Sequence, residues 1–249
     1  MTFTSTTRIP VSGLTKRIGT LGKAREFGIL IALALVVTAA TAKNPSFLFS
    51  ADGWRDLLLT PSILALVAIG QAIVIITRNV DLSVGSVMGL TAYLTGRLFI
   101  DVPALPIPVV VLLAVGFGAL LGLVNGVLVA YARVPAMVIT LGTLYAYRGI
   151  NVMWAGSTRV NASDIPREFL AIGTGQFLTI PLLAIVALVL LVVIAWYMRN
   201  TRGGREYYAI GSDPSAAELY GLRVTRRVLS AFILSGALAG LAGVFYVAR

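Results

Sequence analysis

The stretch Gly203–Gly221, with the sequence GGREYYAIGSDPSAAELYG, decides how this chain is organised. It is the longest polar interval in the sequence and lies between two apolar runs that are each long enough to cross a bilayer. Asp213 is suited to the N-cap of a short helix, Pro214 to its first turn, and Gly221 to the left-handed residue that ends it. Because a helix of about two turns is unstable alone in water, the stretch predicts contact with a partner protein.

The composition around this stretch is that of an integral membrane protein. Hydrophobic residues make up 58% of the 249 residues and charged residues 12%, whereas soluble domains carry about 25% charged residues. The sequence has no cysteine and no histidine, which excludes disulfides, thiolate metal sites and Ser-His-Asp hydrolysis. The net charge of +10 fits basic loops beside a membrane. We therefore expect an all-α polytopic membrane protein that is not an enzyme and binds no nucleic acid.

Apolar runs of about 20 residues, the length needed to cross a bilayer, recur along the chain. The first run follows the basic segment 1–26, an arrangement also found in signal peptides, but the many later runs favour a retained first span. The sequence thus predicts seven transmembrane helices. They are Phe27–Ala42, Leu57–Thr77, Val84–Ile100, Leu105–Ala130, Val134–Ala155, Phe177–Met198 and Val228–Ala248.

Basic residues are distributed unevenly over the predicted connections. With the N-terminus inside, thirteen Lys and Arg side chains of the 1–26 segment, the 199–227 loop, Arg78 and Arg133 lie on the cytoplasmic side, against five on the other side. Loops on the cytoplasmic side of membrane proteins are enriched in Lys and Arg. We therefore expect both the 1–26 segment and the 199–227 loop to be cytoplasmic.

Small residues recur at four-residue spacing in three of the predicted spans. Such spacing lets helix backbones approach closely in lipid, so it predicts a packed helix bundle. The residues are Gly85, Gly89, Gly118, Gly122, Gly126, Gly236 and Gly240.

The connection 77–85, with the sequence TRNVDLSVG, places two opposite charges three residues apart. One interpretation is an interfacial turn in which Asp81 or Ser83 caps the helix that begins near Val84. The alternative places Asp81 in a water-filled path, because ionisable groups at membrane depth are usually functional. The spacing favours the cap.

Several polar residues fall inside the predicted spans, where polar side chains normally face the interior of the bundle. Most are expected to form interhelical hydrogen bonds, and a minority to line a pathway for a hydrophilic solute. They are Gln71, Asn125, Thr140, Thr143, Arg148 and Asn151.

Two interpretations of Gly203–Gly221 remain open from the residues alone. One is an amphipathic connector on the inner leaflet, helped by Tyr207 and Tyr208. The other is a docking helix that presents the small residues 215–217 to a cytosolic protein. The nucleotide-binding pattern GxxxxGK[ST] is absent. We thus expect no cofactor in this chain, and ATP, if it powers transport, would be bound by another subunit.

Four motifs resemble those of bacterial ribose-type sugar ABC-transporter permeases. Residues 78–86 (RNVDLSVGS) resemble the xxIDLSVGS signature, and residues 204–221 are similar to the GRxxYAIGxNPxAAxxxG loop, with Asp213 in place of the usual Asn. Residues 235–243 match SGxxAxxAG, and residues 141–149 are similar to the LGTxxxYRG stretch of the rhamnose and autoinducer-2 branches. The resemblance covers about residues 57–249.

The resemblance implies that residues 27–249 form a transmembrane permease domain in the bacterial inner membrane. It imports a monosaccharide or a related polyol-like solute, and the 199–227 loop couples it to a cytosolic ABC ATPase. Further implied partners are a second permease subunit, identical or different, a periplasmic or lipoprotein sugar-binding protein, and membrane lipid. The coupling residues would be Gly211, Asp213, Pro214, Ala216, Ala217 and Gly221. The signature and possible pathway residues would be Gln71, Asp81, Ser83, Gly85, Asn125, Thr143 and Arg148.

Family members continue through further spans beyond the position of Arg249, so the resemblance also implies a C-terminally truncated chain. The alternative function is a secondary transporter driven by an ion gradient, a class that usually keeps ionisable groups at the membrane midplane. In this sequence only Asp81 and Arg148 would serve that role.

Overall fold

The structure is a computed structural model that describes residues 12–249. Side chains are described from Phe27 onward, apart from those at 51, 52 and 54. Residues 1–11 of the predicted cytoplasmic segment 1–26 lie outside the described residues. The chain divides into two compact units, and the boundary between them along the sequence lies between Trp54 and Arg55. The first contains the helices α1 (Ser12–Lys43) and α2 (Ser46–Phe49).

The second unit is helical, as the sequence predicted, except for one short hairpin that was not predicted. The first helix, α3, begins just before the boundary between the units. The elements are α3 (Ala51–Ile76), α4 (Val84–Asp101), α5 (Ile107–Ala130), α6 (Ala136–Ala155), the 3₁₀ helix η1 (Ala162–Asp164), α7 (Arg167–Thr174), β1 (Gln176–Phe177), β2 (Ile180–Pro181), α8 (Leu182–Asn200), α9 (Arg202–Ser212), α10 (Pro214–Leu219) and α11 (Val224–Ala248).

The hairpin displaces the start of a predicted span. Strands β1 and β2 pair antiparallel, with Phe177 opposite Ile180, and the two turn residues between them, Leu178 and Thr179, have positive φ. The helix α8 therefore begins at Leu182. The prediction of a span from Phe177 is wrong at its start because the hairpin holds that residue extended.

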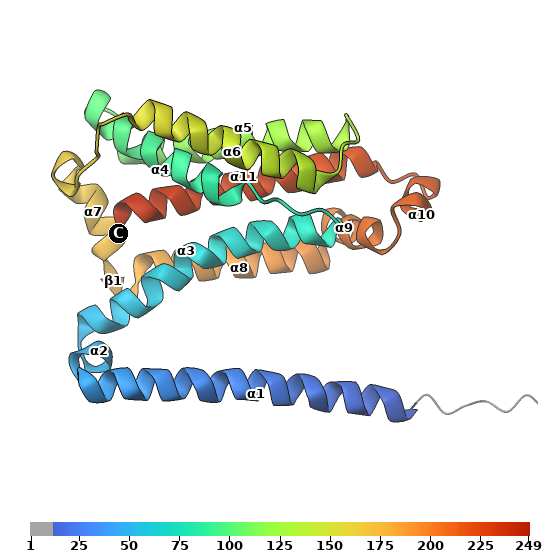
Figure 1. The fold of residues 1–249 in the computed structure, drawn as a ribbon, viewed down its shortest axis with the longest axis horizontal. Helices are drawn as coiled ribbons and strands as arrows, with labels where there is room; N and C mark the ends of the chain where they lie inside the picture. Colours follow the sequence, from blue (N-terminus) through green and yellow to red (C-terminus); the bar gives the residue numbers. More distant parts are fainter. Residues whose placement is uncertain (1–11) are drawn as a thin grey trace, which may run out of the picture. The chain divides into compact units, whose positions relative to one another are not determined.

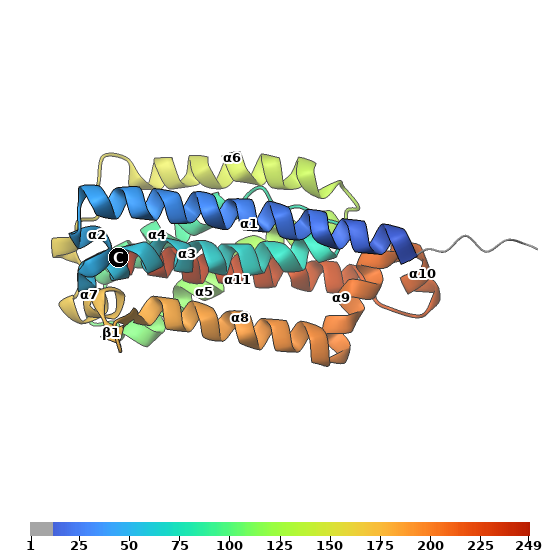
Figure 2. The same ribbon diagram turned by 90° about the horizontal axis from the view of Figure 1, so that it is seen from below.

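The axes of the long helices of the second unit lie roughly parallel between two ends of the bundle, and α3 and α11 run in opposite directions along it (Figure 1). The short helix α10 lies at one end, beyond α9 and the start of α11. The helix α7, the hairpin and the C-terminus lie at the other end, and the view from below agrees (Figure 2). The polar stretch Gly203–Gly221, which contains α10, therefore lies at one end of this unit.

Within the described part of the chain, four helices are long and apolar enough to cross a membrane. They are 55–76 of α3, α5, α8 and α11. The predicted count of seven spans is therefore not confirmed. Helix α4 carries Arg97 and Asp101, paired at 2.6 Å, and α6 carries Arg148. These charged residues separate α4 and α6 from the four apolar helices, and of α1 only the apolar stretch Phe27–Lys43 lies within the described side chains.

Helix α11 is the centre of the second unit. It contributes residues to all four apolar clusters of the core: one with α3 and α8, one with α3, α5, α6, α8 and α9, one with α4, α5 and α7, and one with α4, α5 and α6. Within its apolar 18-residue segment, 67% of α11 is buried, whereas in the corresponding segment of α8 only 17% is buried. Every other element therefore packs around α11 or onto elements that contact it.

The closest helix pair is α5 and α11, and glycines make their approach possible. A Cβ atom on Gly122 would lie 2.2 Å from the carbonyl oxygen of Phe232, and one on Gly118 would lie 2.4 Å from that of Gly236. A Cβ on Gly236 would in turn lie 2.3 Å from the carbonyl oxygen of Gly118. The close packing that the four-residue glycine spacing predicted is confirmed for α5 and α11, a pairing that the spacing alone did not specify.

The same prediction is wrong for α4. Gly85 has nothing within 4 Å of its Cβ position, and Gly89 meets only the side chain of Asn151 at 3.6 Å. The helix instead approaches α11 where a Cβ on Gly243 would lie 2.7 Å from the carbonyl oxygen of Met88. The glycine that permits this contact therefore belongs to α11.

Replacing Gly122 by Ala should destabilise the helix pair by about 1–3 kcal/mol, because the new methyl group meets the backbone of Phe232. Gly116→Ala is the matched control, since nothing lies within 4 Å of that position on the same helix. We expect it to be neutral or stabilising by up to about 1 kcal/mol. Thermal unfolding of the purified variants, followed by size-exclusion chromatography, checks this; equal losses at both positions would contradict the packing.

Candidate functional site

Helix α10 has the two capped ends that the sequence predicted. The Asp213 carboxylate accepts hydrogen bonds from the backbone N–H groups of Ser215 and Ala216, at 2.9 and 3.1 Å. At the other end Gly221 has φ +79°, and the next N–H, that of Leu222, donates to the carbonyl of Ala217 at 3.0 Å. This is a Schellman ending. Both ends of the helix are therefore fixed by local bonds.

The face that α10 presents outward differs from the predicted one. Ala217 is only 4% exposed, whereas Leu219 and Tyr220 are 89% and 87% exposed. The prediction that Ala217 belongs to a free contact face is wrong, because α10 turns that side chain towards α9 and α11, which it contacts. The exposed surface of α10 ends in an aliphatic and an aromatic side chain, a combination suited to burial by another protein.

The preceding helix α9 was not predicted. The side chain of Thr201 caps it by accepting from the N–H of Gly204 at 3.0 Å, and its inner face holds Tyr207 and Ile210, each 1% exposed. The sequence signals were a threonine three residues before Gly204 and two apolar residues at i, i+3 spacing. The Tyr207 ring is buried in protein, so the interpretation that it rests on lipid is wrong. Tyr208 is 52% exposed.

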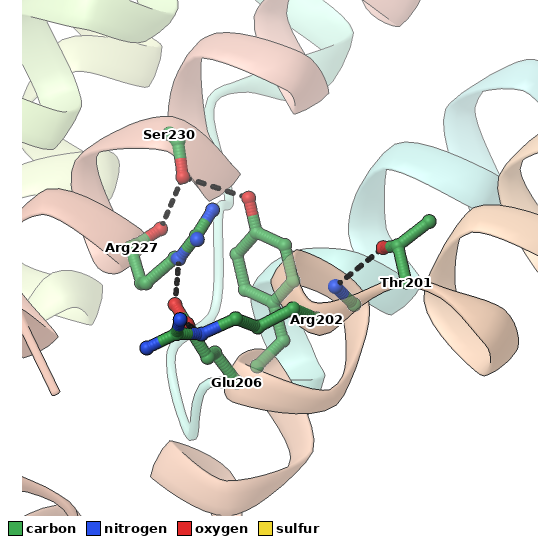
Figure 3. Close-up of polar contacts among 7 residues, drawn as sticks. Thr201, Arg202, Glu206, Arg227 and Ser230 are labelled. Atoms are coloured by element: carbon green, nitrogen blue, oxygen red, sulfur yellow. Dashed lines mark hydrogen bonds and ion pairs between the residues drawn. The ribbon is translucent and has the colours of Figure 1, made fainter.

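A charged cluster ties α9 to the first turns of α11 (Figure 3). The Arg227 Nε donates to one carboxylate oxygen of Glu206 at 2.6 Å, and the Arg202 Nε donates to the other at 3.2 Å. The Glu206 side chain is 14% exposed and that of Arg202 87%, so the Arg202 pair contributes little to stability. The hydrogen bond from Arg227 lowers the pKa of Glu206 below its ordinary value.

The Tyr207 hydroxyl adds a neutral contact to the same junction. It lies 2.7 Å from the Ser230 Oγ of α11, and Ser230 donates to the carbonyl of Arg227 at 2.8 Å. Burial raises the pKa of the Tyr207 hydroxyl, so this group remains protonated at neutral pH. The junction of α9 and α11 therefore combines one strong ion pair with a hydroxyl pair.

A second connection joins α9 to the 77–83 segment. The Arg78 guanidinium donates to the carbonyl oxygens of Gly211 and Ser212 at 2.6 and 2.5 Å. These carbonyls end α9, where helices leave acceptors without partners and favour a cation. A Cβ on Gly211 would lie 1.9 Å from the carbonyl oxygen of Ile76. Glycine at 211 therefore lets the end of α9 lie directly against the end of α3.

The 77–83 segment continues from Arg78 into a buried polar network. The Asp81 carboxylate is 3% exposed and accepts from the N–H and the hydroxyl of Ser83 at 2.9 and 2.6 Å. Asp81 thus forms a turn just before α4, while Ser83 occupies the N-cap position without a side-chain cap bond. The carboxylate therefore faces protein groups at the start of α4, close to the capping interpretation, though neither residue forms a standard cap.

Three helices bond to this segment. Gln71 of α3 donates to the carbonyl of Asp81, Asn125 of α5 donates to the Ser83 hydroxyl at 2.7 Å, and Thr140 of α6 donates to the carbonyl of Val80 at 3.2 Å. The Tyr147 hydroxyl lies 3.4 Å from the Asn125 Oδ1. Gln71, Asp81, Ser83 and Asn125, which were predicted separately, are therefore brought together.

Other predicted site residues lie outside the network. Thr143 donates to the carbonyl of Thr140 within α6 at 3.3 Å, and Arg148 is exposed on the same helix. The buried Oδ1 of Asn151 has no hydrogen-bond partner among the described residues, and the residue lines a pocket of about 730 Å³ between α4, α6, α7 and the end of α11. Among the described side chains no three acidic groups gather as a metal site.

Comparison with known proteins places these features in a family. Residues 55–249 match the family model described as branched-chain amino acid transport system / permease component. The chain is 36% identical over 230 residues to the autoinducer 2 import system permease protein LsrC of Enterobacter sp. (strain 638), covering 92% of this chain and 66% of that protein.

LsrC of Klebsiella pneumoniae (ATCC 700721) is 35% identical over 230 residues, covering 92% and 65% of the two chains. LsrC of Escherichia coli (K12 / DH10B) is 34% identical over 225 residues, covering 90% and 64%. The chain therefore spans a little under two thirds of the length of these relatives. No solved structure matches it.

Replacing Arg78 by Gln should loosen the end of α9, because two charge-assisted hydrogen bonds to its carbonyls are lost. We expect the lost bonds to have stabilised this end by about 2 kcal/mol. Amide exchange across Arg202–Gly221, measured by hydrogen-exchange mass spectrometry, should therefore become roughly 30-fold faster. Arg133→Gln, an exposed arginine in the connection between α5 and α6, is the control and should leave these peptides unchanged. Unchanged exchange in Arg78→Gln would contradict the connection.

Replacing Glu206 by Gln should remove a pH-dependent contribution to stability. Since the folded-state pKa of Glu206 is lowered from 4.5, its stabilising effect is fully present above that value and is lost as the pH falls through the lower, folded-state pKa. The wild-type chain should unfold at a higher temperature than Glu206→Gln at pH 7, and the difference should shrink below about pH 4. A constant difference across this range would argue against the ion pair with Arg227.

Proposed function

The chain belongs to the family of branched-chain amino acid transport system permease components, and from this membership we propose that it is the transmembrane permease subunit of an ATP-binding-cassette importer. Members of this family are inner-membrane proteins, and the described part of the chain has four helices long and apolar enough to span that membrane. The sequence lacks the phosphate-binding loop of an ATPase. In this proposal the nucleotide is bound and hydrolysed by a separate cytosolic ABC ATPase.

The contact with the ATPase is proposed to be made by α10. This helix is short, so it would be unstable alone, but Asp213 and Gly221 fix its two ends. Its exposed end carries Leu219 and Tyr220, and burying these two side chains in a groove would supply much of the contact energy. The exposed, capped helix at one end of the bundle is the observation that carries the proposal.

Movement of α10 would be transmitted to the membrane helices through the two connections that α9 makes, one with α11 and one with the 77–83 segment. The Glu206–Arg227 pair links α9 to α11 at 2.6 Å, and Arg78 links the end of α9 to the 77–83 segment. The first joins two charged groups and the second joins a charged guanidinium to backbone carbonyls, so both are stronger than neutral hydrogen bonds. A displacement of α9 and α10 by the ATPase would therefore pull on the centre of the bundle at two places.

The proposed solute is a monosaccharide or a related polyol-like molecule. The support is that the relatives described above are named as permeases for autoinducer 2 import. A second permease subunit and a periplasmic or lipoprotein binding protein would complete the importer. Family membership favours this assembly over transport driven by an ion gradient, and the buried, locally bonded Asp81 gives no reason to prefer the latter.

Leu219→Arg should weaken co-purification with the cytosolic ABC ATPase of this importer by about tenfold or more, since a charge replaces an apolar contact that the complex buries. The measurement is the amount of ATPase retained by the tagged permease after co-expression. Tyr131→Arg is the control, because Tyr131 is another exposed aromatic residue, 57% exposed, at the end of α5. Full retention of the ATPase by Leu219→Arg would contradict docking through α10.

A further inference from the structure

A basic pocket of about 520 Å³ lies between α9 and the start of α11. Four of the residues that line it are arginines and one is a glutamate, so its lining is strongly cationic. The residues are Arg202, Glu206, Gly221, Leu222, Arg223, Arg226, Arg227 and Ser230. Figure 3 shows its wall, with Arg227 and Arg202 both directed to the Glu206 carboxylate.

The four arginines of the pocket carry more positive charge than its single carboxylate neutralises. Arg202 and Arg227 share the single carboxylate of Glu206. Arg223 and Arg226 are exposed, and neither forms an ion pair with any described residue. Two guanidinium groups thus remain available to an anion from outside the chain, and guanidinium groups bind phosphate oxygens in a forked, two-bond geometry.

The N-terminus of α11 adds to the attraction for an anion. This helix is 25 residues long and begins at Val224, between the pocket residues Arg223 and Arg226. The Val224 N–H donates to the carbonyl of Leu222, so the helix contributes the positive end of its dipole and not a bond from that group. The dipole and the arginine side chains favour the same kind of ligand.

The position of the pocket along α11 indicates where the anion comes from. Arg227 and Ser230 line the pocket and belong to the candidate membrane span Val224–Ala248, so the pocket lies at the level where the apolar span begins. Lipid headgroups occupy this level of a bilayer. Helix α10 lies farther out at the end of the bundle (Figure 1), and neither its exposed Leu219 nor the capping residue Tyr220 lines the pocket. The proposed ATPase contact and the pocket therefore use different surfaces.

We propose that this pocket binds the phosphate group of an anionic phospholipid from the membrane leaflet next to the 199–227 loop. Arg223 and Arg226 contact the phosphate, while Arg227 is held in place by Glu206. A bound lipid fastens the first turn of α11, and with it α9, to the membrane surface. The site does not depend on the ATPase or on the transported solute.

The test uses the purified 249-residue chain in a neutral detergent, with phosphatidylglycerol, phosphatidylcholine or inorganic phosphate added and bound molecules counted by native mass spectrometry. We expect phosphatidylglycerol to bind more tightly than phosphatidylcholine. The double variant Arg223→Gln, Arg226→Gln should bind it about 30-fold more weakly, at roughly fivefold for each arginine. Arg133→Gln, which removes an exposed arginine outside the pocket, should bind it as the wild type does.

Three results would overturn the proposal. Equal phosphatidylglycerol binding by the wild type and the double variant would place the lipid elsewhere. Inorganic phosphate binding as tightly as the lipid would make the occupant a free anion. Retained lipid binding combined with lost co-purification of the ATPase would make the pocket a protein-docking surface. If the double variant does not elute as a single species, Arg226→Gln alone gives the same comparison with an expected loss of about fivefold.

Discussion

The close approach of α5 and α11 is the constraint on which the rest of the second unit depends. With no side chain at Gly118, Gly122 and Gly236, carbonyl oxygens of one helix lie against the backbone of the other. Apolar burial between helices gives no driving force in lipid, so close packing of this kind stabilises the pair. It fixes α11 at the centre of the four core clusters, and thereby fixes where the first turn of α11 meets α9.

The loop at the end of the bundle is anchored to that centre by charged side chains at two separate points. Glu206 and Arg227 hold α9 to α11, and Arg78 holds the end of α9 to the segment that leads into the buried network of Asp81, Ser83 and Asn125. A single anchor would let α9 pivot. Two anchors on different elements restrict it to motions in which α11 and the 77–83 segment move together.

Local features of this fold could be predicted from the sequence, and features that depend on distant contacts could not. The caps at Asp213 and Gly221 depend on neighbouring residues alone, and the glycine spacing predicted close helix packing without specifying α5 and α11 as the pair. The inward orientation of Ala217 depends on α9 and α11, and the bond from Arg78 to Gly211 joins residues far apart in the chain. The count of seven spans is not confirmed, since α4 and α6 carry charged residues that lower their apolar character.

The bond between Asn125 and Ser83 has a mechanical consequence for the bundle. Ser83 and Asn125 are both fully buried, and leaving such groups without partners costs about 1–3 kcal/mol each. Sliding α5 along its axis by one helical turn, about 5.4 Å, would break the bond and leave the buried Asn125 amide without its donor contact, while Ser83 keeps only its bond to Asp81. The register of α5 against the 77–83 segment is thereby locked, so any opening of the bundle has to proceed by tilting whole helices.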